Sequence, residues 1–209
     1  MRHAFVTAVT LELATPYGEA RVRLHSAQTP RGGLVLGHGA GGGVEAPDLV
    51  AATGAALAQG FSVALVEQPY RVAGKRSSPP PHHLDAAWIA VCEQLAAGEL
   101  SGLPLITGGR SAGARVACRT AADVGAAAVL CLAFPLQPPP RKGKEPGPSR
   151  LDELDAVDVP VLVVQGERDR FGMPPPGSDR EIVPVSGDHS LRSDPDAVAA
   201  AVADWLKRR

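Results

Sequence analysis

Short apolar runs alternate with segments of helical spacing along most of the chain, and this alternation limits the possible folds more than any other feature. Unbroken apolar runs are typical of strands buried on both faces, and helices between them allow neighbouring strands to run parallel. We therefore expect an α/β fold of three layers, with helices on both faces of a mostly parallel sheet. The expected strands cover residues 33–37, 61–66, 103–107, 126–134, 160–165 and 181–185, and the expected helices cover 47–59, 84–97, 114–122 and 195–207.

The chain opens with two segments of mixed polar and apolar residues, 6–13 and 19–24, which predict an antiparallel hairpin before the parallel strands. A length of 209 residues fits one domain, and we assign residues 1–209 to it. Residues 135–149 are rich in Pro, Gly, Lys and Arg. This segment is expected to be an exposed excursion that is too short to fold as a cap domain.

Charge and cysteine content exclude several classes of function. The formal net charge is -1 and the pI is about 6.6, whereas binding to nucleic acid or to an anionic membrane usually requires a basic excess. No apolar stretch approaches the ~18 residues of a membrane helix, and the first residues do not resemble a signal peptide. The three cysteines, Cys92, Cys118 and Cys131, are widely spaced, so they indicate buried thiols. We expect a cytoplasmic protein that needs no metal or cofactor.

The sequence Gly109-Arg-Ser-Ala-Gly113 follows one of the predicted strands and leads into a predicted helix. This context matches the G-x-S-x-G turn, in which flanking glycines make room for a sharp bend that exposes the serine hydroxyl. Ser111 is therefore the candidate nucleophile. A serine between glycines is otherwise an ordinary turn residue, but the strand before it and the helix after it favour the catalytic interpretation.

Ligands of such sheets bind at the carboxyl ends of the strands, and two further candidates follow strand ends there. Asp169 and His189 give the order Ser, Asp, His along the chain, which is the order of α/β-hydrolases. A serine needs an imidazole to accept its proton, and the imidazole needs a carboxylate to fix its tautomer. Glu167 and Asp188 are alternative acids, but we favour Asp169, because Glu167 comes where its strand is just ending and Asp188 adjoins the histidine itself.

The glycine cluster 37–43 follows the first parallel strand and is expected to help to bind the oxyanion of the tetrahedral intermediate. One donor is the N–H of Ala112, directly after the nucleophile, and the second is that of Ala40, with Gly41 as the nearby alternative. His38 is expected to fix this loop rather than act as a second base. A phosphate-binding turn is a rival interpretation, but the cluster lacks the G-K-[ST] ending and the G-x-G-x-x-G spacing. Contact with substrate is expected from Gly39, Gly41, Tyr70, Arg71 and Phe134.

Several segments together carry a family resemblance over nearly the whole chain from about residue 33. They are residues 37–42, 67–71 with 73–76, 79–81, 84–88, 108–113, 164–169 with 171–172, and 187–191. On these segments the chain resembles small α/β-hydrolases of the dienelactone-hydrolase-like group. It is most similar to the family of testis-expressed protein thirty and the hydrolase-like domain of the NSL complex's third subunit. The resemblance implies an α/β-hydrolase fold and the triad Ser111, Asp169 and His189. Dienelactone hydrolases proper have cysteine as nucleophile, so Ser111 departs from their pattern.

These observations favour a serine hydrolase that cleaves a small ester, thioester or related acyl bond through an acyl-enzyme. A catalytically silent binding or scaffold module is the alternative from another class, because fold alone does not fix function. Transfer of the acyl group to an acceptor other than water would use the same residues. Seven basic residues are expected either to form a rim that selects anionic substrates or to be solvated charges: Arg71, Lys75, Arg76, Arg110, Arg141, Lys142 and Lys144.

Overall fold

The computed structural model describes residues 8–140 and 145–209, which form one eight-stranded sheet. The strand order is β1-β2-β4-β3-β5-β6-β7-β8. From β4 to β8 all neighbouring strands pair in parallel, whereas β1 with β2 and β2 with β4 are antiparallel. The strands are β1 (Ala8–Thr15), β2 (Gly18–His25), β3 (Gly32–Gly37), β4 (Phe61–Glu67), β5 (Leu105–Arg110), β6 (Ala128–Leu132), β7 (Val161–Gly166) and β8 (Arg180–Val185).

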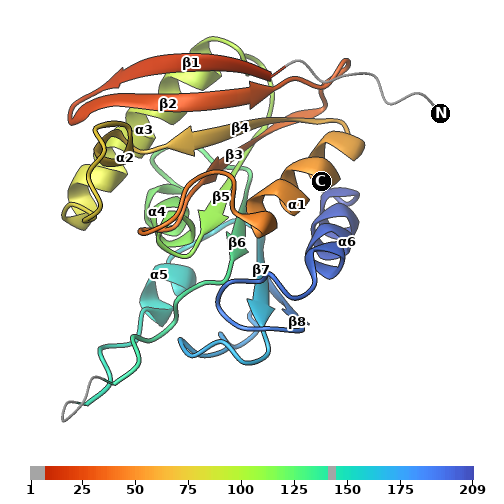
Figure 1. The fold of residues 1–209 in the computed structure, drawn as a ribbon. Helices are drawn as coiled ribbons and strands as arrows, with labels where there is room; N and C mark the ends of the chain where they lie inside the picture. Colours follow the sequence, from red (N-terminus) through yellow and green to blue (C-terminus); the bar gives the residue numbers. More distant parts are fainter. Residues whose placement is uncertain (1–7, 141–144) are drawn as a thin grey trace.

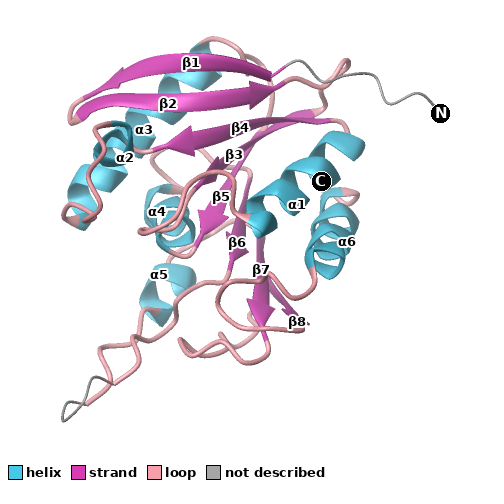
Figure 2. Cartoon of the chain, viewed as in Figure 1, coloured by secondary structure: helices cyan, strands magenta, loops and turns pink. Residues whose placement is uncertain are grey.

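Helices cover both faces of the sheet and complete the three layers (Figure 1 and Figure 2). On one face, α1 and α6 pack beside each other over an apolar cluster that includes Leu34 and Trp205. On the other face, α3 packs on α4 and α4 on α5. The helices are α1 (Pro47–Ala58), α2 (Pro69–Val72), α3 (Pro81–Ala97), α4 (Ala112–Thr120), α5 (Leu151–Asp155) and α6 (Pro195–Leu206).

The inner strands are hydrophobic because helices cover both of their faces. Every residue of β3, β6 and β7 is buried, whereas the edge strand β1 alternates between exposed and half-buried positions. This is the burial that unbroken apolar runs predict for a parallel sheet. The sheet therefore gives the segments that follow β3, β5, β7 and β8 a rigid base at one edge, where the site residues lie.

Two short helices, α2 and α5, were not expected from the sequence, and α3 begins at Pro81 rather than at Leu84. The N–H groups of the first helical turn have no partner within the helix, so proline, which has no N–H, can begin a helix. In the excursion 135–149, the described residues form no helix or strand that could cover the site, and Figure 1 shows these described residues projecting from the body of the domain. Its residues 141–144, with Arg141, Lys142 and Lys144, lie outside the described part of the chain.

Candidate active site

Ser111 lies between the end of β5 and the start of α4, in a backbone conformation that side chains other than glycine rarely adopt. Its φ is 52° and its ψ is -106°. A non-glycine residue in such a region costs about 1–3 kcal/mol, and the surrounding packing must hold it there. The strained turn carries the serine hydroxyl past the end of the strand, as the G-x-S-x-G pattern predicts.

The glycines on either side of Ser111 are required because the turn packs directly on β3. A Cβ on Gly109 would lie 2.5 Å from the carbonyl oxygen of Gly37, and one on Gly113 would lie 2.4 Å from the same oxygen. These contacts are with backbone, so a side chain at either position would displace β3 or the turn. The sequence Gly-x-Ser-x-Gly thus follows from the close approach of β5, α4 and β3.

The structure brings Ser111, His189 and Asp169 into one chain of hydrogen bonds. The Oγ of Ser111 lies 2.9 Å from Nε2 of His189, and Nδ1 of His189 lies 2.7 Å from Oδ2 of Asp169. The Asp169 side chain is 0% exposed, while that of His189 is 19% exposed. A buried carboxylate that faces Nδ1 leaves Nε2 of the imidazole free to accept the serine proton.

The Asp169 carboxylate is held by two donors from its own neighbourhood. Its Oδ1 accepts the backbone N–H of Phe171 at 2.9 Å, and its Oδ2 accepts Nε2 of Gln165 at 2.8 Å. The ring of Phe171 packs on the His189 imidazole with 4.4 Å between centroids. Sequence reasoning did not assign a role to Gln165 or Phe171, although both belong to the segment that carried the family resemblance.

Neither alternative acid forms a hydrogen bond with His189 among the described residues. Asp188 accepts the backbone N–H and the hydroxyl of Ser190 at 2.8 and 2.6 Å, and these hydrogen bonds lower the pKa of its carboxyl. Glu167 is exposed. Of the three candidate acids, Asp169 is therefore the one that the structure brings to the imidazole.

The loop after β3 lies next to the serine turn, and its N–H at Ala40 has no partner within the part of the chain that the structure describes. His38, which is 3% exposed, contacts the carbonyl oxygen of Gly39 through Nδ1 at 2.8 Å and accepts the N–H of Gln68 at Nε2. Gly42 donates to the same Gly39 oxygen. Because a peptide is planar, fixing this carbonyl also fixes the N–H of Ala40, which points the opposite way.

Neither expected oxyanion donor has an acceptor among the described residues. Among the backbone hydrogen bonds between described residues outside the regular elements, none has the N–H of Ala40 or Ala112 as donor. The same holds for Gly41, where a side chain would meet open space, so this position does not need glycine on steric grounds. Gly39 is different, because a Cβ there would lie 2.8 Å from Nη1 of Arg110.

Two of the residues expected to contact substrate serve the protein's own structure. Tyr70 is 7% exposed, and its hydroxyl donates to the carbonyl oxygen of Ala40 at 2.8 Å. Phe134 is 0% exposed and lies in the apolar cluster beneath α4 and α5, so its side chain does not reach a substrate. The expectation for Phe134 is corrected on this point: the chain turns at Ala133, whose φ is 50°, and directs the aromatic ring into the core.

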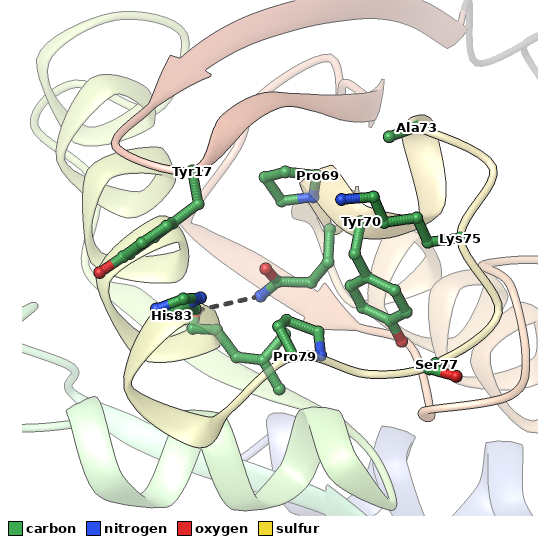
Figure 3. Close-up of a pocket in the computed structure, with 10 residues that line it drawn as sticks. Tyr17, Pro69, Tyr70, Ala73, Lys75, Ser77, Pro79 and His83 are labelled. Atoms are coloured by element: carbon green, nitrogen blue, oxygen red, sulfur yellow. Dashed lines mark hydrogen bonds between the residues drawn. The ribbon is translucent and has the colours of Figure 1, made fainter.

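A pocket of about 470 Å³ lies beyond the end of β4 (Figure 3). Tyr70 forms part of its wall, and Lys75 lines it as well. The ring of Tyr17 stacks on that of His83 at 3.9 Å between centroids, so His83 has a partner that the sequence did not indicate. The lining residues are Tyr17, Gln68, Pro69, Tyr70, Ala73, Lys75, Ser77, Pro79, His83 and Leu84.

The other described basic residues of the expected rim do not line this pocket. Arg71 lies in α2, where its Nη1 is 3.5 Å from the carbonyl oxygen of Lys75, and Arg76 is exposed. The Arg110 side chain points into the domain, where it meets the fully buried carboxylate of Asp48. Burial raises the pKa of Asp48, while the nearby Arg110 guanidinium opposes this shift.

Within residues 8–140 and 145–209, no group of three or more His, Cys, Asp or Glu side chains is arranged to hold a metal ion. None of the helices in those same residues is both long enough and apolar enough to cross a membrane.

The geometry agrees with comparisons between this chain and known proteins. A family model described as an alpha/beta hydrolase domain matches residues 30–194, which is more than half of the chain. The chain therefore belongs to the α/β-hydrolase family. No curated protein matches it closely enough to count as a relative.

Solved structures with the same fold align over nearly the whole chain. The lidless α/β serine hydrolase XC6422 from Xanthomonas campestris has a TM-score of 0.77 at 17% identity, with 100% of this chain and 97% of that chain covered. Est1E from Butyrivibrio proteoclasticus has a TM-score of 0.74 at 15% identity, with 95% of this chain and 98% of that chain covered. Dienelactone hydrolase from Anabaena variabilis has a TM-score of 0.72 at 14% identity, with 97% of this chain and 95% of that chain covered. The predicted lidless α/β-hydrolase fold with an N-terminal hairpin is confirmed.

Proposed function

We propose that this protein is a serine hydrolase that cleaves a small ester, thioester or related acyl bond through an acyl-enzyme intermediate. The observation that carries the proposal is the part-buried chain of hydrogen bonds from Ser111 through His189 to Asp169. His189 accepts the proton of the Ser111 hydroxyl at Nε2 as Oγ attacks the acyl carbon. Asp169 holds the imidazole in the required tautomer and stabilises the imidazolium that forms.

Negative charge then develops on the former carbonyl oxygen of the substrate, and we assign its stabilisation to the N–H groups of Ala112 and Ala40. Both are unpaired among the described backbone hydrogen bonds, and donors fixed in place before the reaction need no reorganisation. The imidazolium of His189 donates its proton to the leaving group, and the acyl group stays on Ser111. A water molecule, activated by His189 in the same way, releases the acid and restores the hydroxyl.

We further propose that the pocket beyond β4 receives the part of the substrate that is distant from the bond cleaved. Tyr70 links this pocket to the proposed oxyanion donor, because it lines the pocket and its hydroxyl donates to the carbonyl oxygen of Ala40. Lys75 lines this pocket, and its positive charge favours a substrate that carries a carboxylate.

The test compares an ester with its ω-carboxylated analogue. A kcat/KM preference for the charged ester, lost at high salt and in Lys75→Gln, supports this assignment, and equal values at low salt contradict it.

Two finer assignments belong to the same proposal. On the segments that carry the family resemblance, we place the chain nearest to the family of testis-expressed protein thirty and the hydrolase-like domain of the NSL complex's third subunit. We also infer that the enzyme acts in the cytoplasm, because its three cysteines are buried free thiols.

Labelling with a fluorophosphonate probe separates the enzyme from a silent scaffold. The probe reacts with a serine only when a base activates it, so we expect covalent labelling of the wild-type protein and none of Ser111→Ala. Thr120→Ala is a matched control, because it removes a buried hydroxyl that donates to the backbone of its own helix, and it should be labelled normally. A wild-type protein that remains unlabelled at high probe concentration would support the scaffold instead.

A further inference from the structure

Arg110 stands directly before Ser111 in the chain, and its guanidinium contacts two segments that are distant in sequence. Its Nη2 donates to the backbone carbonyl oxygen of His189 at 3.0 Å. Its Nε lies 2.9 Å from Oδ2 of Asp48, in the first turn of α1, as an ion pair without the alignment of a hydrogen bond. The Arg110 side chain is 18% exposed and that of Asp48 is 0% exposed.

Arg110 also lies against the loop that carries the proposed oxyanion donor. A Cβ on Gly39 would come within 2.8 Å of Nη1 of Arg110, so the glycine leaves the space that the guanidinium occupies. One side chain therefore meets the loop after β3, the first turn of α1 and the loop after β8. It does so from the residue beside the nucleophile.

Asp48 keeps the guanidinium in this direction. Its Oδ1 accepts the backbone N–H of Leu49 at 3.0 Å, near the N-terminus of α1, where the helix dipole favours a carboxylate. The Oδ2 atom is left to face Arg110. An arginine suits this place because its planar fork can face a carboxylate with one nitrogen and a carbonyl with another.

We propose that Arg110 is a positioning residue that holds the His189 loop at the correct distance from Ser111. This inference rests on the proposed function. The bond between Oγ of Ser111 and Nε2 of His189 joins the ends of β5 and β8, which are separated in the sheet by β6 and β7. Asp169 and Phe171 orient the imidazole ring. Arg110, which precedes the nucleophile in the chain, instead binds the backbone carbonyl oxygen of His189.

Arg110→Lys is the informative variant. It keeps a positive charge for the buried Asp48 carboxylate but replaces the fork of donors by a single ammonium. The rate of Ser111 labelling by a fluorophosphonate is measured as a function of probe concentration, per folded chain. We expect the maximal labelling rate to fall by about 10- to 100-fold, the cost of a small misplacement of a reacting group. The concentration at half-maximal rate should stay within a few-fold of the wild type.

Arg119→Lys is the matched control. Arg119 is 21% exposed and forms a part-buried ion pair with Asp85, but it lies farther along α4, where it contacts Asp85 and Glu153. The Arg119→Lys variant should lose about as much stability as Arg110→Lys and keep the wild-type labelling rate. Equal maximal rates for Arg110→Lys and the wild type would overturn the inference. So would a loss in Arg110→Lys that Arg119→Lys matches at equal loss of stability.

Failure of the proposed function gives a different result. In that case the wild-type protein itself is not labelled at Ser111, and both the hydrolase assignment and the role of Arg110 fall. A labelled wild type with a normally labelled Arg110→Lys variant overturns the role of Arg110 alone.

Discussion

The hydroxyl of Tyr70 shows how one residue can link the loop after β4 to the proposed oxyanion donor. It donates to the carbonyl oxygen of Ala40, in the loop that the buried His38 also holds. In Tyr70→Phe we expect kcat to fall about tenfold and KM to change little, because a loop that holds the transition state is loosened. Stability should fall by about 1 kcal/mol, the typical net value of a hydrogen bond.

Steady-state kinetics with p-nitrophenyl acetate, together with urea unfolding, checks the Tyr70 prediction. Tyr70 also forms part of the pocket wall that we propose to contact the substrate, but the substitution removes only the hydroxyl, which binds the Ala40 carbonyl oxygen. A large rise in KM at constant kcat would show that this hydroxyl binds substrate and would contradict its role in holding the loop.

The choice of acid is tested by three amide substitutions at the residue scale. Asp169→Asn should lower kcat by about 10⁴-fold, because the imidazole loses both its tautomer and the support of its positive form. Glu167→Gln and Asp188→Asn should change kcat little, since one residue is exposed and the other bonds Ser190. Parallel assays on the three variants decide the matter, and a larger loss in Asp188→Asn would show that the assignment of the acid is wrong.

Sequence reasoning could predict which three side chains meet at the edge of the sheet, but not all of their contacts. Ser111, Asp169 and His189 follow strand ends, and parallel strands deliver such residues to one edge of the sheet. Phe134 also follows a strand, yet the turn at Ala133 directs it into the core. The contact of Arg110 with His189 joins residues far apart in the chain, and no local pattern indicates it.

At the scale of elements, the packing of β5 and α4 on β3 requires a glycine at 113. A methyl group there would lie 2.4 Å from the Gly37 carbonyl oxygen. Gly113→Ala should therefore destabilise the protein by about 1–3 kcal/mol, as overpacked sites do. Gly54→Ala is the control, because a side chain there meets open space on α1. It should stabilise the protein by about 0.5–1 kcal/mol. Thermal unfolding of both variants checks the pair, and a neutral Gly113→Ala would contradict the close approach.

The long elements were predictable because each carries a repeated signal. The apolar runs of the inner strands and the helical spacing of α1, α3 and α6 extend over several residues. In contrast, α2 and α5 span only four and five residues, too few for a period to appear. Their formation depends on the residues that they pack against.

At the scale of the whole molecule, buried histidine makes the stability of the fold sensitive to acid. Burial lowers the pKa of His38 below its ordinary value of 6.5. As pH falls through that value, the unfolded chain takes up a proton that the folded chain does not, so stability decreases. Burial also lowers the pKa of His25, which is less buried than His38. Urea unfolding between about pH 7.5 and 5.5 should therefore show a smaller loss of stability in His38→Asn than in the wild type. Equal losses would contradict the prediction.

In the proposed mechanism, Ser111 carries the acyl group during turnover. The most direct measurement mixes the protein rapidly with a p-nitrophenyl ester, follows the release of p-nitrophenol, and locates the acyl group by mass spectrometry of the quenched protein. We expect a burst of p-nitrophenol equal to the number of active sites, with the acyl group on the peptide that contains Ser111. A steady release without any acylated protein, or an acyl group on another residue, would contradict it.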